Sequence, residues 1–150
     1  MYELHLQQDF RIDVDEIWQF ITNPTNLEEI TPSYMNFKIT SEVPAEMYEG
    51  LIIEYKVKLP VLGVTDWIIH IKNVVPGRQF VSEQRTGPFS FWQHHHELEK
   101  TGKGSRMTDK IHYRLPYGQI GMLANNLFFG KRLYAIFRYR NDMLGLKFGN

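Results

Sequence analysis

The chain has 150 residues, a length typical of one domain, and we expect residues 1–150 to form a single unit. Its 17 Lys and Arg balance its 17 Asp and Glu, which argues against a nucleic-acid-binding protein, because such proteins are usually basic. The absence of cysteine excludes disulfides and thiolate chemistry. The N-terminal segment lacks the basic-then-apolar order of a signal peptide, and no apolar run is long enough to span a membrane. We therefore expect a cytoplasmic protein without integral membrane association.

The N-terminal segment predicts one strand followed by two short helices. Residues 2–10 alternate apolar and polar side chains, which indicates a strand. The first helix has Asp13 as its N-cap and Glu16 as a capping-box partner three residues later. Pro24 ends this helix, and residues 25–30 predict a second short one.

Alternation then predicts six further strands separated by turn sequences that contain glycine or proline. The expected strands cover residues 35–43, 50–59, 65–74, 78–85, 90–100 and 106–116. A glycine-rich loop at residues 101–104 joins the last two as a hairpin.

The C-terminal segment, residues 117–148, changes to helical periodicity. Apolar residues recur at spacings of three, four or seven: Ile120, Leu123, Leu127, Tyr134, Phe137 and Leu144. Gly130 is a candidate bend, and the basic residues between 130 and 140 are expected on a solvated face. Strands and helices segregated in this way predict an α+β fold.

The run of three histidines at residues 94–96 lies in the strand that precedes the glycine-rich loop. If that loop closes the hairpin, residues whose numbers sum to about 205 lie opposite one another. The resulting inner face pairs Leu98 with Met107, His96 with Asp109, His94 with Ile111 and Trp92 with Tyr113. The opposite face, expected in water, carries Gln93, His95, Glu97, Thr108, Lys110 and His112.

His94, His96 and Asp109 form an inward polar group on an otherwise apolar face, and three interpretations remain open. The group is a hydrogen-bonded core network, or the polar end of a ligand pocket, or a metal or catalytic site. Gln84, on the same strand face as Phe80, is a second inward polar candidate. Because no third ligand position is fixed by spacing, we predict neither a metal nor a cofactor.

The chain resembles the START-like, helix-grip superfamily, and within it the polyketide cyclase/dehydrase-like (SRPBCC) ligand-binding group. The resemblance rests on the stretches "NPTNLEEITP", "MYEGLIIEYKV", "PGRQFVSEQRTGPFSFWQHHHELE", "MTDKIHYRLPYG" and "IFRYRNDML". It implies a seven-stranded antiparallel sheet wrapped around the long C-terminal helix, two short helices after the first strand, and a deep apolar cavity. The motif positions that it carries over are Gln84, Trp92, His94, His96, Asp109 and Tyr113. Ser82 departs from the group, which often has an acidic residue there.

These observations together predict a binding protein for a hydrophobic or aromatic small molecule, lipid-like or polyketide-like. The expected ligand-binding residues are Tyr55, Trp67, Phe80, Gln84, Trp92, His94, His96, Asp109, Ile111 and Tyr113. One alternative is a cyclase or dehydrase in which His96, polarised by Asp109, is the general base. The other is a stress or protein-interaction module whose core is filled.

Overall fold

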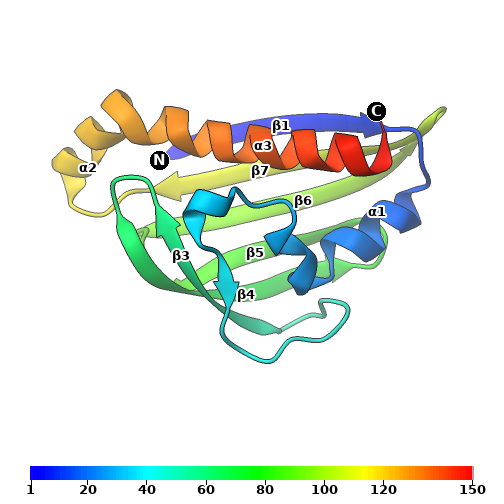
Figure 1. Ribbon diagram of the computed structural model, residues 1–150, viewed down its shortest axis with the longest axis horizontal. Coiled ribbons are helices and arrows are strands. Elements are labelled where there is room, and N and C mark those ends of the chain that lie inside the picture. The colour runs from blue at the N-terminus through cyan, green and yellow to red at the C-terminus, as the bar shows by residue number, and fades with distance from the viewer. Residues whose placement is uncertain (150) are drawn as a thin grey trace.

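The computed structural model describes residues 1–149 and contains seven strands that form one antiparallel sheet. The strands are β1 (Tyr2–Phe10), β2 (Lys38–Ile39), β3 (Ile52–Leu59), β4 (Gly63–Val75), β5 (Gln79–Thr86), β6 (Phe91–Thr101) and β7 (Gly104–Arg114). Their order across the sheet is β1-β7-β6-β5-β4-β3-β2, so that the pairing of β1 with β7 joins strands that are distant in sequence (Figure 1). All seven predicted strands are present.

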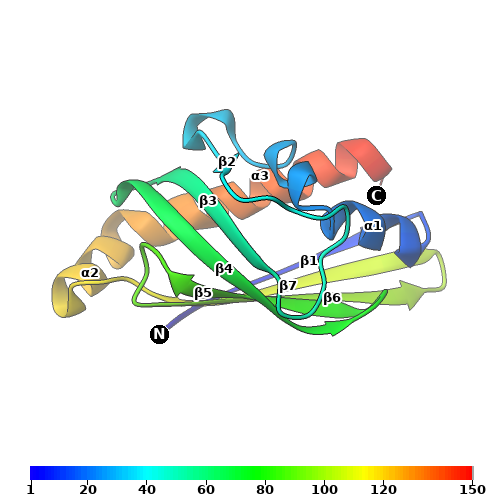
Figure 2. The same cartoon turned by 90° about the horizontal axis from the view of Figure 1, so that it is seen from below.

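The helices fall into two groups that both pack on the concave face of the sheet. The N-terminal group comprises α1 (Val14–Ile21) and the 3-10 turns η1 (Pro24–Glu28) and η2 (Ser33–Met35). The C-terminal group comprises α2 (Gly118–Ala124), the π-helical turn η3 (Asn125–Phe129) and α3 (Gly130–Phe148). Figure 2 shows the sheet curving beneath α3, with residues 14–37 on the same side. This is the predicted α+β, helix-grip arrangement, except that the second of the two predicted short helices is the 3-10 turn η1.

The start of α1 confirms Asp13 as the N-cap, but Glu16 contacts the cap through its backbone and not through the side chain that a capping box uses. The Asp13 carboxylate accepts a hydrogen bond from the backbone N–H of Asp15 at 2.9 Å. Glu16 contacts the cap through its backbone N–H, which donates to the Asp13 carbonyl at 3.2 Å. The cap satisfies donors that a helix start leaves unpaired, and it orients the apolar face of α1 toward the sheet.

Strand β3 shows how alternation builds the core. Its inward side chains and the residue before it are buried, namely Leu51, Ile53, Tyr55, Val57 and Leu59. The intervening Glu54, Lys56 and Lys58 are exposed. Because burial of apolar surface is the main favourable term in folding, this pattern fixes which face of the sheet turns toward α3.

The hairpin of β6 and β7 has the predicted register. Trp92 lies opposite Tyr113, His96 lies opposite Asp109, and Thr101 and Gly104 form the closing pair. Gly104 is required at this position because an added Cβ would lie 2.2 Å from the backbone oxygen of Phe10. The same loop thus sets the hairpin register and lets the end of β1 approach closely.

The C-terminal helix differs from its predicted apolar stripe. Only Phe137 and Leu144 of the six stripe residues are buried, whereas Ile120, Leu123, Leu127 and Tyr134 are exposed. Two features account for this difference. Gly121 packs directly on the chain before it, where an added Cβ would lie 2.1 Å from the Pro116 oxygen, and the π-helical turn then shifts the helical phase.

Helix length and composition also bear on membrane association. Among the helices of residues 1–149, none is long and apolar enough to cross a membrane.

Candidate ligand-binding site

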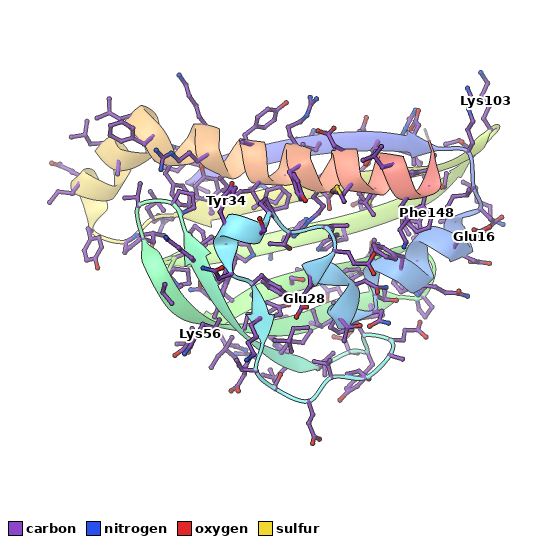
Figure 3. The ribbon with its side chains drawn as sticks, in the orientation of Figure 1. Glu16, Glu28, Tyr34, Lys56, Lys103 and Phe148 are labelled. Atoms are coloured by element: carbon purple, nitrogen blue, oxygen red, sulfur yellow. The ribbon has the colours of Figure 1, made fainter. Side chains whose placement is uncertain are left out.

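A cavity of about 100 Å³ lies between the sheet, α3 and the turns η1 and η2. Its wall is mainly apolar, with Leu27, Ile30 and Met35 from the N-terminal turns and Leu133 and Ile136 from α3. The turn that carries Tyr34 crosses between β3 and α3 in Figure 3. The cavity is therefore covered by short 3-10 turns on one side and by a regular helix on the other.

The end of α3 packs against α1 and the end of β1. Phe148 packs edge-on against Phe20, with ring centroids 5.2 Å apart, and against Phe10 at 6.4 Å (Figure 3). Edge-to-face aromatic pairs add about 0.5–1.5 kcal/mol each beyond the area they bury. This aromatic contact ties the C-terminal helix to the N-terminal one.

Seven of the ten expected ligand-binding residues line the cavity, which has aromatic and polar parts. They are Tyr55, Trp67, Phe80, Trp92, His94, His96 and Asp109. Three of the aromatic members contact one another, since Trp67 lies 4.9 Å from Trp92 and 6.4 Å from Tyr55 between ring centroids.

The other three expected residues lie outside the cavity lining and hold the surrounding structure. The Gln84 side chain donates a hydrogen bond to the Phe89 carbonyl at 2.8 Å and accepts one from the Phe89 N–H at 3.3 Å. These two bonds stabilise the turn between β5 and β6. The Tyr113 hydroxyl donates to Asn125 Oδ1 at 2.7 Å and thereby anchors the π-helical turn. Ile111 is fully enclosed in the core.

His94, His96 and Asp109, the histidine–aspartate cluster, are all buried and share one oxygen atom. Asp109 Oδ1 lies 2.8 Å from His94 Nε2 and 3.1 Å from His96 Nδ1. The two imidazole rings are 3.6 Å apart between centroids, and His96 stacks on Phe80 at 4.2 Å. Cross-strand pairing of His96 with Asp109 and the two-residue repeat of the strand bring these groups together.

The protonation state of the cluster follows from burial and hydrogen bonding. Burial lowers the pKa of His94 to about 3, and the neighbouring His96 adds to this effect against the opposing influence of Asp109. Burial likewise lowers the pKa of His96. Burial alone favours neutral Asp109, but hydrogen bonds from both histidines outweigh it and hold the pKa of Asp109 well below its usual value. At neutral pH, two neutral histidines therefore donate to one carboxylate.

The opposite face of the hairpin is less exposed than predicted. His95 and His112 are partly exposed and lie near Glu97 and Glu3. Thr108, which was expected in water, is buried and accepts a hydrogen bond from Gln7 at 3.3 Å. The neighbouring strand β1 supplies this cover, so the prediction for Thr108 was wrong because it considered only one strand pair.

Sequence reasoning missed Arg140, which lines the cavity from α3. The basic residues of this region were expected in water, yet Arg140 is partly buried, with its guanidinium 4.9 Å from the centre of the Phe137 ring. Phe137, Arg140 and Leu144 lie three and four residues apart and so share one helix face. That spacing was the available signal. Ser82 also lines the cavity, from β5.

The cluster also has the composition of a metal-ligand set. His94, His96 and Asp109 offer three ligand atoms within 4.8 Å of one another. However, the hydrogen bonds described above already engage one nitrogen of each imidazole with the carboxylate. A metal bound by these same nitrogen and oxygen atoms would have to replace those contacts.

Fold and site define a helix-grip protein with an apolar internal cavity and a buried polar group in its wall. The family model described as polyketide cyclase/dehydrase and lipid transport matches residues 11–133. The chain belongs to this family.

Solved structures from several bacteria share the fold. A protein from Chromobacterium violaceum has a TM-score of 0.72 at 10% identity, covering 99% of this chain and 98% of that one. Others come from Arthrobacter aurescens (0.69, 12%, covering 96% and 86%) and Nitrosomonas europaea (0.65, 15%, covering 97% and 95%). At such identities the likeness shows the fold alone. No curated protein was found to match the chain.

Proposed function

We propose that this chain binds a hydrophobic small molecule in the cavity between the sheet and α3. The observation that carries the proposal is a mainly apolar cavity whose wall also carries a small number of polar side chains. Such a combination is typical of small-molecule sites, in which apolar walls supply affinity and a few polar groups orient the ligand. Membership of a family described by lipid transport supports the same class of ligand.

The size of the cavity sets a condition on this function. Its volume of about 100 Å³ is below the roughly 300–1,000 Å³ of usual ligand pockets. A micromolar affinity needs about 8 kcal/mol, which corresponds to burial of about 300 Å² of apolar ligand surface before the cost of immobilisation. A ligand of that size requires the cavity to widen, and the short turns η1 and η2 are the part of its wall without regular α-helix or sheet pairing.

A neutral fluorescent probe such as phenylnaphthylamine tests the proposal, because its emission rises on transfer to an apolar site. We expect saturable binding with a micromolar dissociation constant. Ser82→Leu is the matched variant, since it fills the cavity from the sheet without removing any hydrogen bond of the histidine–aspartate cluster. It should abolish probe binding while the protein keeps or gains thermal stability. Absence of saturable binding by wild type would remove the proposal.

An enzymatic role is the second candidate, favoured by one feature of the cluster. Asp109 orients His96, which lines the cavity, in the way that a carboxylate orients a general base. The lowered pKa of both histidines makes them weak bases, which ranks this candidate second. Mass spectrometry of a bound molecule before and after incubation tests it: a change of mass that His96→Gln prevents would favour the enzyme.

A further inference from the structure

Arg140 is a cationic group of the cavity wall with an unused hydrogen-bond donor. Its Nε is enclosed and has no hydrogen-bond partner among residues 1–149. A buried donor without a partner costs about 1–3 kcal/mol, and more when the group is charged. Retaining such a donor inside a cavity is understandable if a ligand supplies the missing acceptor.

The buried anion Asp109 does not pair with the Nε of Arg140. The charge of Asp109 acts on Arg140, but Oδ1 of Asp109 receives the hydrogen bonds of His94 and His96. Burial lowers the pKa of Arg140, while Asp109 and Tyr55 oppose that effect. A guanidinium remains charged in proteins even so, because its pKa lies far above neutrality. The cavity therefore holds a permanent cation whose Nε lacks an acceptor.

A second unused donor lies on the sheet side of the same cavity. The indole Nε1 of Trp67 is enclosed and also lacks a partner among the described residues. Both unpaired atoms on the cavity wall are thus N–H donors, one from α3 and one from β4. Donors call for a ligand that presents acceptors, and a charged donor favours an anionic acceptor.

We propose that the ligand is an amphipathic carboxylic acid whose carboxylate is bound by Arg140 and whose apolar body occupies the remainder of the cavity. This inference rests on the proposed binding function and adds the chemical class of the ligand. A planar carboxylate matches the guanidinium fork with two parallel hydrogen bonds. It is also the smallest of the common organic anionic groups, which suits a cavity of about 100 Å³ better than a phosphate ester.

Octanoate and octanol form the matched probe pair, because they share a chain and differ at the head group. Calorimetric titration at neutral pH should show octanoate binding at least tenfold more tightly than octanol to wild type. Arg140→Gln should remove that preference while octanol binding persists, and Arg140→Lys should keep part of it because the charge remains. Arg132→Gln, an exposed position on the same helix, is the control and should keep the full preference.

The outcomes separate the two proposals. Octanol that binds as tightly as octanoate, or a preference that survives Arg140→Gln, overturns the carboxylate inference and leaves the binding function standing. If neither compound nor the neutral fluorescent probe binds, both proposals fall. The comparison of octanoate with octanol uses the wild-type protein alone, so it tests the inference even if a variant folds poorly.

Discussion

Replacing His94 with Gln should make the protein markedly less sensitive to acid. The pKa of His94 is lowered by burial to about 3, from an ordinary value of 6.5 in the unfolded chain. Below about pH 6.5 the unfolded state therefore binds a proton that the native state does not bind. The free energy of unfolding consequently falls as the pH falls toward 3. Gln can still donate a hydrogen bond from Nε2 to Asp109, but it does not titrate.

The expected magnitude follows from the two pKa values. Between about pH 7 and pH 5, a histidine with these values removes about 2 kcal/mol of unfolding free energy. His96 acts in the same direction, because burial lowers its pKa as well. Asp109 contributes only at lower pH, since stability from a carboxylate with a lowered pKa is lost below its unfolded value of about 4.

Urea unfolding followed by tryptophan fluorescence at the two pH values measures this linkage. Wild type should lose about 2 kcal/mol more than His94→Gln on acidification. His95→Gln, one position along the strand and partly exposed, should behave like wild type. An equal loss in wild type and His94→Gln would mean that His94 is not held neutral by burial, and the protonation scheme of the cluster would be wrong.

Three further predictions follow from the hairpin and its polar cluster. In a denaturant melt, His96→Ala should lower the free energy of unfolding by about 1–3 kcal/mol, because it removes a buried hydrogen bond. His95→Ala and His112→Ala should each change it by no more than about 0.5 kcal/mol. Equal effects would contradict the inward orientation of His96. Gly104→Ala should lower the free energy of unfolding by about 1–3 kcal/mol, because the added Cβ would clash with the backbone of Phe10. Gly102→Ala, which has open space around it, should change it little. Similar melting temperatures for the two variants would argue against that close contact. Elemental analysis should find less than one zinc or iron per chain, and a stoichiometric metal that His96→Ala removes would refute this.

The strand part of the fold was predictable because a strand has only two faces. Alternation assigned Trp92, His94 and His96 inward, and the length of one loop fixed which residues lie opposite them. A slip of one residue would have turned the apolar set outward, so the pattern itself excluded other registers. The proximity of Asp109 to His96 followed from the same rule.

The faces of the C-terminal helix were less predictable, because the rotation of each residue about the helix axis adds to that of the residues before it. Each residue turns an α-helix by about 100°, and a single π-helical turn adds a residue and rotates everything beyond it. The close packing of Gly121 sets the orientation of α2, and the turn at 125–129 then sets that of α3. Sequence periodicity alone contains neither contact, which is why Ile120 and Leu127 were expected in the stripe.

The interpretations of the inward polar group as core network and as pocket wall turn out to be compatible. The hydrogen bonds of His94 and His96 end on Asp109, so the cluster is internally paired without any ligand, although both histidines line the cavity. Arg140 differs, because its Nε stays unpaired until an acceptor enters. Substitutions in the cluster should therefore lower the stability of the empty protein, whereas Arg140→Gln should chiefly reduce the additional stability that an anionic ligand confers. A melt with and without octanoate separates these contributions on the same set of variants.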